Sequence, residues 1–277
     1  MKNIIRFAFT LSILTVGFTS CTKVINLDLN SANPNIVVDA EVTDQPGPYT
    51  VNLTKTVNFS DNNVFPPIYG ASVIISDNVG NSETLVETSA GFYTTSHLQG
   101  VVGRTYNISI TNEGKNYTAI STMPAGVSID SVIADTSANQ GGGFGGGGRS
   151  GPPSVSIKAI FTDPSGIANY YRLIEYTNRV PNYKNISVIS DNLQDGSVIT
   201  ANVTRRDTTI HHGDSVTVIL ESIDANVYEY FRTLRQITRP QTGFQASVPG
   251  NPTTNLSNNA LGFFSAQAVR QKTIVVP

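Results

Sequence analysis

The sequence predicts an all-β protein made of two β-sandwich domains, the second of which carries one amphipathic helix. Short segments rich in Val, Ile, Thr and Tyr recur along the chain and alternate in polarity, as half-buried strands do. Clusters of Gly, Pro, Asn and Asp separate these segments at short intervals, which is typical of turns between strands. One segment near the C-terminus changes from a period of two to the period of an α-helix. Strands punctuated this regularly are typical of a β-sandwich.

Composition limits the classes of protein to which the chain can belong. Its 277 residues are enough for one large or two ordinary domains. The 18 Lys and Arg against 20 Asp and Glu give a formal charge of −2, so no basic surface is available to bind nucleic acid. The hydrophobic share of 39% is low, but it is too high for a disordered chain. A single cysteine excludes a disulfide framework and a cysteine-based zinc site.

The N-terminus has the organisation of a lipoprotein signal peptide, which we assign to residues 1–20. Lys2 and Arg6 provide a basic start, and the apolar run over residues 4–18 is shorter than the ~20 residues that a spanning helix needs. Small polar residues then precede Cys21, in an order that resembles a bacterial lipobox. We therefore expect cleavage before Cys21 and its modification with fatty acyl chains such as palmitate. The alternative is an ordinary signal peptide that ends in cysteine by chance.

The rest of the chain is predicted to form a linker and two sandwiches. Residues 21–34 are the anchor and linker, residues 35–124 the N-terminal sandwich, and residues 125–277 the C-terminal sandwich. About seven predicted strands precede the Met-Pro-Ala-Gly step at residue 124, which matches one immunoglobulin- or prealbumin-like unit. A single continuous fold over both halves is the alternative. The predicted strands cover residues 35–44, 49–57, 71–76, 84–87, 91–95, 105–111, 117–122, 127–134, 154–161, 169–178, 186–190, 197–203, 215–223, 262–269 and 273–276.

Residues 224–238 are predicted to form the helix of the second sandwich. Asp224 is a suitable N-cap, and Pro240 is a suitable stop. Since a lone helix of this length is marginal in water, we expect its apolar stripe to pack against the second sandwich. The rival hypothesis is that the stripe docks on a partner. The stripe comprises Val227, Tyr230, Phe231, Leu234 and Ile237.

Three arginines lie off this apolar stripe, toward the C-terminal end of the predicted helix, where positive charge interacts favourably with the helix dipole. They are Arg232, Arg235 and Arg239. We interpret them as a solvated helix face, and a ligand-binding patch is the alternative.

Several motifs invite a chemical interpretation that their context does not support. The glycine-rich run at residues 141–148 leads into a strand and not a helix, so we expect a flexible loop and not a phosphate-binding site. His211 and His212 have no companion ligand at a recognisable spacing, and His97 is distant in sequence. The acidic segment at residues 191–196 lacks ligands of the EF-hand pattern, so we predict a β-turn there.

The sequence nominates no catalytic residue, no metal ligand and no cofactor-binding residue. Asp163 begins a segment that is interpreted as a turn. The chain has no G-x-S-x-G elbow and no supported Ser-x-x-Lys motif, and Cys21 is used by the anchor. Sequence spacing does not single out a pair of catalytic carboxylates. We therefore expect a non-enzymatic protein, with a hydrolase as the third hypothesis behind the two given below.

Short motifs stand at residues 21–29, 36–42, 70–77, 91–93, 161–164, 169–172, 255–264 and 266. In their order and spacing they resemble the Bacteroidota envelope lipoproteins of the domain of unknown function 4249 family. The resemblance covers essentially the whole mature chain. The chain departs from the family at Asn258 and Asn259, where the family usually has Gly, and in the glycine-rich insertion at residues 141–148.

The resemblance implies a location rather than an activity. Members are envelope lipoproteins, often encoded beside TonB-dependent outer-membrane receptors, and no catalytic residue is carried over. Our leading hypothesis is a lipid-anchored outer-membrane protein that binds a ligand or partner and assists a TonB-dependent transporter. The alternative is a structural or adhesive surface module whose Ser/Thr/Asn-rich strands face glycan or protein. The face of the outer membrane, periplasmic or external, is left open.

Overall fold

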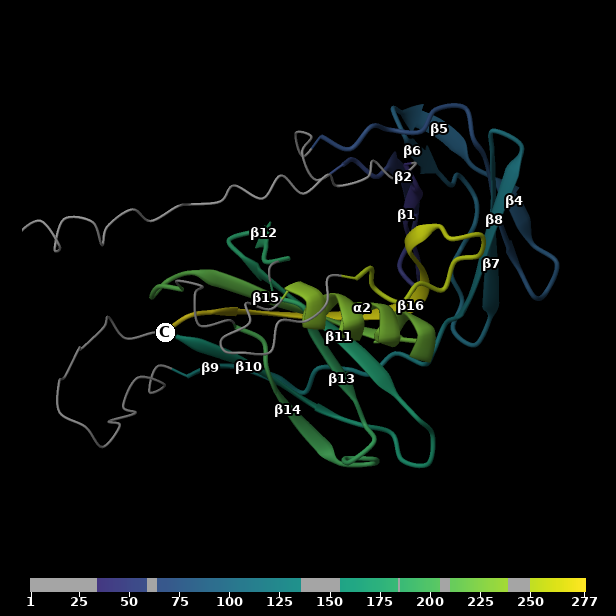
Figure 1. Ribbon diagram of the computed structural model, residues 1–277. Coiled ribbons are helices and arrows are strands. Elements are labelled where there is room, and N and C mark those ends of the chain that lie inside the picture. The colour runs from purple at the N-terminus through teal and green to yellow at the C-terminus, as the bar shows by residue number, and fades with distance from the viewer. Residues whose placement is uncertain (1–33, 59–63, 136–154, 184, 205–209, 239–249) are drawn as a thin grey trace, which may run out of the picture. The chain divides into compact units, whose positions relative to one another are not determined.

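The computed structural model describes residues 34–277 except 59–63, 136–154, 184, 205–209 and 239–249 (Figure 1). The predicted signal peptide, Cys21, the glycine-rich loop at residues 141–148, Arg239 and Pro240 lie outside the described residues. Within the described part, strands β1 to β16 form three sheets, and α2 is the helix that accompanies them. Residues 34–277 belong to one compact unit. The all-β class with one helix is confirmed, whereas the immunoglobulin- or prealbumin-like character stays a prediction.

The elements follow the predicted segments closely. No helix among the described residues is long and apolar enough to cross a membrane. The strands are β1 (Ile36–Thr43), β2 (Thr50–Lys55), β3 (Ser72–Asp77), β4 (Ser82–Thr84), β5 (Val86–Ser89), β6 (Phe92–Thr94), β7 (Thr105–Asn112), β8 (Lys115–Thr122), β9 (Ser131–Asp135), β10 (Ser156–Thr162), β11 (Tyr170–Thr177), β12 (Val180–Pro181), β13 (Ser187–Ser190), β14 (Val198–Asn202), β15 (Ser215–Ile223) and β16 (Leu261–Val275), and the helix is α2 (Ala225–Thr238).

The predicted and observed strands differ at three places. The segment predicted at residues 84–87 is divided between β4 and β5, because the chain crosses from one sheet to another at the buried Leu85. The two strands predicted at residues 262–269 and 273–276 are one continuous strand, β16. The two-residue strand β12 was not predicted, since so short a segment has no detectable period.

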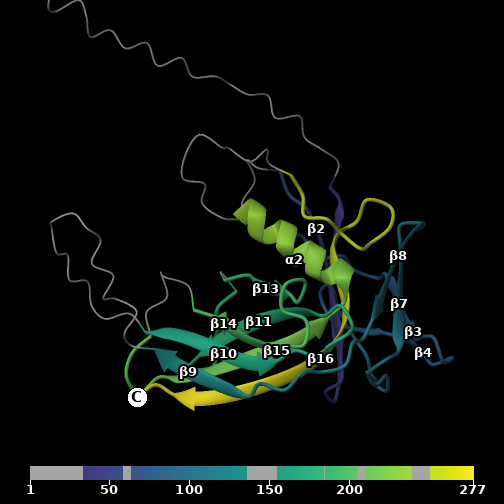
Figure 2. The same cartoon turned by 90° about the horizontal axis from the view of Figure 1, so that it is seen from below.

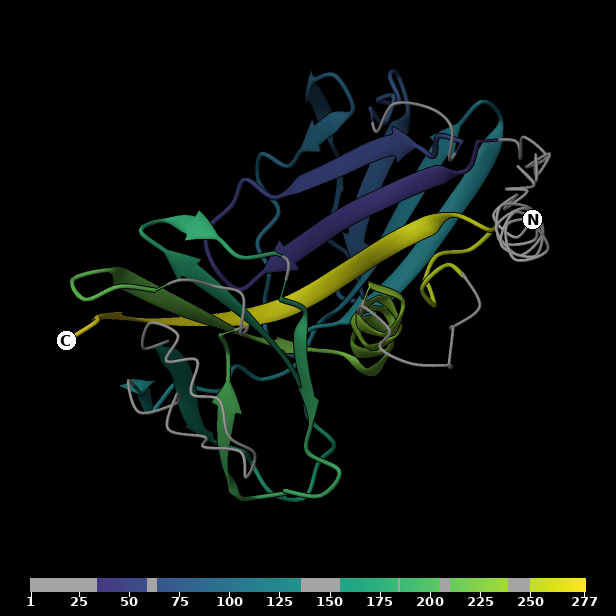
Figure 3. The ribbon, with the colours of Figure 1, turned by 60° about the vertical axis from the view of Figure 1, so that its left-hand side comes forward.

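One large sheet is the common layer of the molecule. Its nine strands have the order β12-β11-β15-β16-β1-β2-β6-β5, with β13 also paired to β11. Figure 3 shows the long yellow strand β16 running beside the purple β1, with which it pairs in parallel. On its other side β16 pairs antiparallel with β15. β16 therefore joins the strands of the N-terminal half to those of the C-terminal half.

Each half of the large sheet packs one face against a smaller sheet. In the N-terminal half, β1, β2 and β16 bury their apolar side chains against the four-stranded sheet β4-β3-β7-β8. In the C-terminal half, β11 and β15 pack against the three-stranded sheet β14-β10-β9. The first core also contains Leu256, Ala260, Phe264 and Ala266 from the end of the chain. The domain boundary predicted near residue 124 stays a prediction. The two halves share strand β16, which pairs with β1 of the first and β15 of the second.

Helix α2 lies alongside β13 and packs on β11 and β16 (Figure 2). The predicted N-cap is confirmed, because Asp224 Oδ1 accepts hydrogen bonds from the backbone N–H groups of Asn226 and Val227, both at 2.9 Å. Asp224 Oδ2 also bonds the hydroxyl of Ser121 on β8. The same carboxylate therefore starts the helix and ties it to the four-stranded sheet.

The predicted apolar stripe of α2 is buried over its first half. Val227 and Phe231 are buried, and Tyr230 and Leu234 are half-buried against the same cluster. The expectation that Ile237 is buried is wrong, since 36% of this residue is exposed. The reason is that the last turn of α2 borders an open groove beside β13 and β14 and does not lie over a sheet.

Candidate functional site

A charged cleft lies on the face of the large sheet that is turned away from the two sandwich cores. The pairing register places Arg172 of β11 opposite Glu221 of β15, and Thr43 of β1 opposite Gln267 of β16. Directly paired residues project from the same face of a sheet, and so do residues two apart on one strand. Asp39 and Glu41 therefore share this face with Arg172, Glu221 and Gln267. We call the space between this face and α2 the sheet-face cleft, with a volume of about 620 Å³.

Aromatic side chains form one wall of the sheet-face cleft. The ring centroid of Phe231 on α2 lies 4.8 Å from that of Phe263 on β16, and Tyr230 lies 4.9 Å from Phe263. The guanidinium carbon of Arg172 is 4.0 Å from the centroid of the Phe231 ring. This distance is that of a cation–π contact, which holds Arg172 against the wall.

Arg172 is paired with two carboxylates at once. Its Nη1 atom is 3.1 Å from Glu41 Oε1 and 3.2 Å from Glu221 Oε2. Burial lowers the pKa of Arg172, but Glu221 and Glu41 outweigh that effect and raise it, so the guanidinium is always charged. Burial raises the pKa of Glu221 to about 7 despite the attraction of Arg172. Burial, followed by repulsion from Glu41, raises the pKa of Asp39.

Gln267 contributes an unused hydrogen-bond donor to the cleft. Its side chain is fully buried, and its Oε1 atom accepts a hydrogen bond from the hydroxyl of Ser265 at 2.7 Å. Its Nε2 atom makes no hydrogen bond of normal geometry to the described residues, although the amide lies beside Glu221 and lowers the pKa of that carboxyl. A buried donor without a partner costs free energy, so a ligand oxygen that accepts from it would be stabilised.

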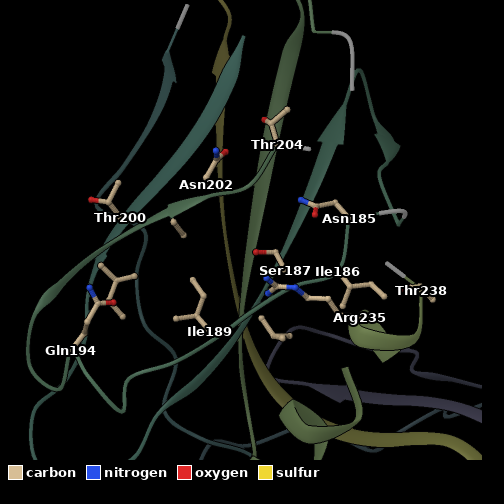
Figure 4. Close-up of a pocket in the computed structure, with 13 residues that line it drawn as sticks. Asn185, Ile186, Ser187, Ile189, Gln194, Thr200, Asn202, Thr204, Arg235 and Thr238 are labelled. Atoms are coloured by element: carbon tan, nitrogen blue, oxygen red, sulfur yellow. The ribbon is translucent and has the colours of Figure 1, made fainter. Parts of the chain in front are cut away.

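A second depression, which we call the polar groove, lies between β13, β14 and the last turn of α2. Figure 4 shows Thr200 and Asn202 of β14 on one side of it, with Asn185 and Ile186 on the other. Its volume is about 510 Å³. In the part of the chain that is described, β13 pairs only with β11 and β14 only with β10, so both strands turn an unpaired edge to their surroundings. Most of the side chains that line the groove are uncharged hydrogen-bonding groups.

A family model described as "Domain of unknown function (DUF4249)" matches residues 22–273. The chain belongs to the DUF4249 family. The match covers nearly the whole chain, and it includes every residue of the sheet-face cleft and the polar groove. A comparison with curated proteins found no match. The resemblance that the motifs indicated is thus confirmed at the level of the family, and the lipid anchor and the Bacteroidota origin stay predictions.

The DUF4249 chain also brings together three carboxylates from two segments that the sequence treats as separate turns. Oxygen atoms of Asp163, Asp191 and Asp195 all lie within 4.8 Å of one another. Each already accepts a protein hydrogen bond: Asp163 from the hydroxyl of Tyr171 and from Gly196 N–H at 3.0 Å, Asp191 from Asn169 N–H at 2.8 Å, and Asp195 from Gly166 N–H at 2.8 Å. These bonds explain the cluster as a cross-link between turns, so we assign no metal to it.

The histidines of the DUF4249 chain are not brought together with such a cluster. The side chain of His97 is 91% exposed, and its Nδ1 atom is 3.9 Å from Glu83. His211 and His212 are exposed in the turn before Gly213. None of the three belongs to the one group of potential metal ligands found among the described residues.

The arginines of α2 have different surroundings. Arg232 forms an ion pair with Glu229 at 2.6 Å on the half-exposed surface of the helix, which agrees with a solvated face. Arg235 instead lines the polar groove. Arg239 lies outside the described residues, so the interpretation of that arginine stays a prediction.

The sequence analysis missed the charged residues of the sheet-face cleft. The only local signal is a charge at alternate positions of strands that are otherwise apolar: Asp39 and Glu41 in β1, and Arg172 in β11. Such alternation also describes an ordinary solvent-facing side of a strand. Only the parallel pairing of β1 with β16, and the order of strands beyond it, places these charges beside Glu221 and Gln267.

Proposed function

We propose that this protein is a lipid-anchored, non-enzymatic binding component of the bacterial outer membrane that captures a ligand or partner for a TonB-dependent transporter. The observation that carries the proposal is the sheet-face cleft, whose volume of about 620 Å³ falls in the range of small-ligand sites. The cleft combines apolar walls with a few charged side chains, of which Glu221 is buried, as such sites do. Perturbed pKa values of Asp39 and Glu221 add support, since they cluster at functional sites.

A binding role is favoured over catalysis by how the charged groups of the cleft are used. The carboxylates of Glu41 and Glu221 hold Arg172, and Arg172 in turn lies on Phe231. Groups held in mutual ion pairs suit recognition better than proton transfer or nucleophilic attack, which need a group poised to react.

The anchor is tested by metabolic labelling of the native host with an acyl-chain analogue. We expect label on the wild-type protein and none on the Cys21→Ala variant, because the thiol is the point of attachment. Ser20→Ala is the matched control, because a small residue is kept at the neighbouring position and labelling should persist. Equal labelling of the wild type and Cys21→Ala would contradict the anchor.

Association with a transporter is tested by affinity purification from membranes in a gentle detergent. A tagged wild-type protein should retain a TonB-dependent receptor, and the genes of the two should be neighbours. If no receptor co-purifies under conditions that preserve other outer-membrane complexes, the transporter part of the proposal is wrong.

The polar groove favours a second candidate, a structural or adhesive module. Its lining is rich in amide and hydroxyl groups, which suit the hydroxyl groups of a glycan. Binding to a glycan array that is lost in Asn202→Ala, without any co-purifying receptor, would favour this candidate over the first.

A further inference from the structure

The charged groups of the sheet-face cleft do not balance. Asp39 and Glu41 face it from β1, Glu221 from β15 and Arg172 from β11. Of the other elements that border it, β16 contributes the amide of Gln267 and α2 the phenol of Tyr230, with Tyr176 and Tyr183 at the β11–β12 end. Three carboxylates therefore meet one guanidinium, which leaves a formal charge of −2 when all are ionised.

Arg172 is not available to bind an anion. Its Nη1 atom is shared between Glu41 and Glu221, and one face of its guanidinium is covered by the ring of Phe231. An anionic ligand would have to displace a carboxylate and would still face the remaining two. A cation instead meets three carboxylates whose combined negative charge is larger than the single positive charge of Arg172.

The remaining groups of the cleft define the rest of the ligand. The half-buried ring of Tyr230, packed on the buried ring of Phe263, offers aromatic surface that can attract a cation and cover an apolar body. The fully buried Nε2 atom of Gln267 makes no hydrogen bond of normal geometry to the described residues, so it can donate to a ligand oxygen. The acceptor must be neutral, because Glu221 lies close to this amide.

We propose that the sheet-face cleft binds an organic cation, in which a primary ammonium or guanidinium group is carried on an apolar body that also bears a neutral oxygen acceptor. The ammonium or guanidinium pairs with Asp39 and Glu221, the apolar body packs on Tyr230 and Phe263, and the oxygen accepts from Gln267. This inference rests on the proposed binding function and names its ligand chemistry. A free amine and a basic residue of a peptide share this chemistry.

Proton release is the signature that distinguishes this binding mode from non-specific attraction. Burial favours the protonated forms of Asp39 and Glu221, whereas a bound cation favours their ionised forms. Binding near neutral pH therefore releases protons, and affinity rises with pH up to about 7, the pKa of Glu221. One coupled proton corresponds to at most about a tenfold gain in affinity per pH unit below that value.

The test is calorimetric titration of the full chain at pH 6 and pH 8 with two cations and one matched anion. Tyramine represents a free amine, the amidated dipeptide of phenylalanine and arginine represents a peptide source, and 3-(4-hydroxyphenyl)propionate is the anion of the same shape as tyramine. We expect at least one cation to bind about three- to tenfold more tightly at pH 8 than at pH 6. We expect the anion not to bind. Which cation binds identifies the source.

Variants locate the site. Asp39→Asn keeps the volume but removes a carboxylate, and it should weaken cation binding at least about tenfold. Glu41→Gln, at the other carboxylate of β1 in the cleft, is the second variant in case Asp39→Asn does not fold. Glu113→Gln is the matched control, because Glu113 is exposed and pairs with Lys55 away from the cleft. Its affinity should equal that of the wild type.

Two results would overturn the inference. One is that neither cation binds, or that the anion binds as well as tyramine. The other is that the cleft variants and Glu113→Gln lose affinity equally. If the receptor still co-purifies while no cation binds, the proposed function stands and only this ligand assignment fails.

Discussion

At the junction between β1 and β16, position 262 has no room for a side chain, so it requires Gly262. Its φ is +92°, and an added Cβ would collide with the carbonyl oxygen of Val38 on β1. Both the strained backbone and the collision oppose any larger residue. Asn258 and Asn259, which precede it, also have positive φ values of 54° and 57°. Asn tolerates this conformation better than most residues, which explains why it can stand where the family usually has Gly.

We predict that Gly262→Ala lowers the free energy of unfolding by more than about 2 kcal/mol. Gly114→Ala is the matched control, since Gly114 has a similar φ of +74° but no atom within 4 Å of an added Cβ. Its cost should be about 1 kcal/mol, from backbone conformation alone. Urea unfolding of both variants measures the difference. Equal losses would mean that the contact with Val38 is not limiting.

Glu221 should make the stability of the protein depend on pH. Its pKa is raised from an ordinary value of 4.5 to about 7, so the folded chain retains a proton that the unfolded chain loses. This contribution to stability is complete below about pH 4.5 and is lost as the pH rises to about 7. We predict that the free energy of unfolding falls more steeply between pH 5 and pH 7 in the wild type than in Glu221→Gln. Asp39, whose pKa is also raised, keeps part of the slope in the variant.

Urea unfolding of both proteins at pH 5, 6, 7 and 8 measures the two slopes. Lys55→Gln is a suitable control, because its ion pair with Glu113 is exposed and it should leave the slope unchanged. The same pH dependence in the wild type and in Glu221→Gln would contradict the raised pKa.

At the scale of elements, some properties of α2 depend on neighbouring residues in the sequence, whereas others depend on the sheets on which the helix packs. The cap at Asp224 and the period of the stripe are properties of neighbouring residues, and both were predicted from the sequence. The burial of the stripe depends on what lies under each turn. Phe231 contacts Arg172 and Phe263 of the large sheet, whereas Ile237 lies in the last turn of α2, where Arg235 and Thr238 line the polar groove. The burial of Phe231 in the chain itself argues against the rival hypothesis that its ring is free to dock on a partner.

We predict that Phe231→Ala lowers the free energy of unfolding by about 3–5 kcal/mol, because a ring that is only 4% exposed leaves a cavity. Arg232→Glu removes a half-exposed ion pair on the same helix and should cost less than about 1 kcal/mol. Thermal and urea unfolding measure both. An unchanged melting temperature for Phe231→Ala would show that the ring does not stabilise the fold.

At the scale of the whole molecule, the sequence predicted the strands better than it predicted their partners. Polarity alternates along each strand, so the positions of β1, β7 and β15 could be predicted locally. Pairing depends on contacts between distant segments, and no local pattern indicates that β16 joins β1 to β15. The sheet-face cleft was missed for the same reason, since Glu41 and Arg172 meet only through that pairing.

The last prediction concerns the mutual dependence of the two halves. Residues 34–124 contain β1, but their core requires Phe264 and Ala266 from β16. A further link is the ion pair of Asp44 with Arg270 at 2.6 Å. Without β16, β1 loses its parallel partner and becomes an unpaired edge of the sheet. We therefore predict that a fragment of residues 34–124 is unfolded alone, and that residues 34–277 unfold in a single transition.

Two-dimensional NMR of the isotope-labelled fragment provides the measurement, because a folded sandwich gives dispersed amide signals and an unfolded chain does not. Addition of the complementary fragment of residues 125–277 should restore dispersion, since it supplies β16. Addition of the same fragment carrying Gly262→Ala should restore less, because the added Cβ obstructs the pairing of β16 with Val38. A dispersed spectrum from residues 34–124 alone would instead favour two independent sandwiches with a boundary near residue 124, and β16 would then be an addition to a domain already complete.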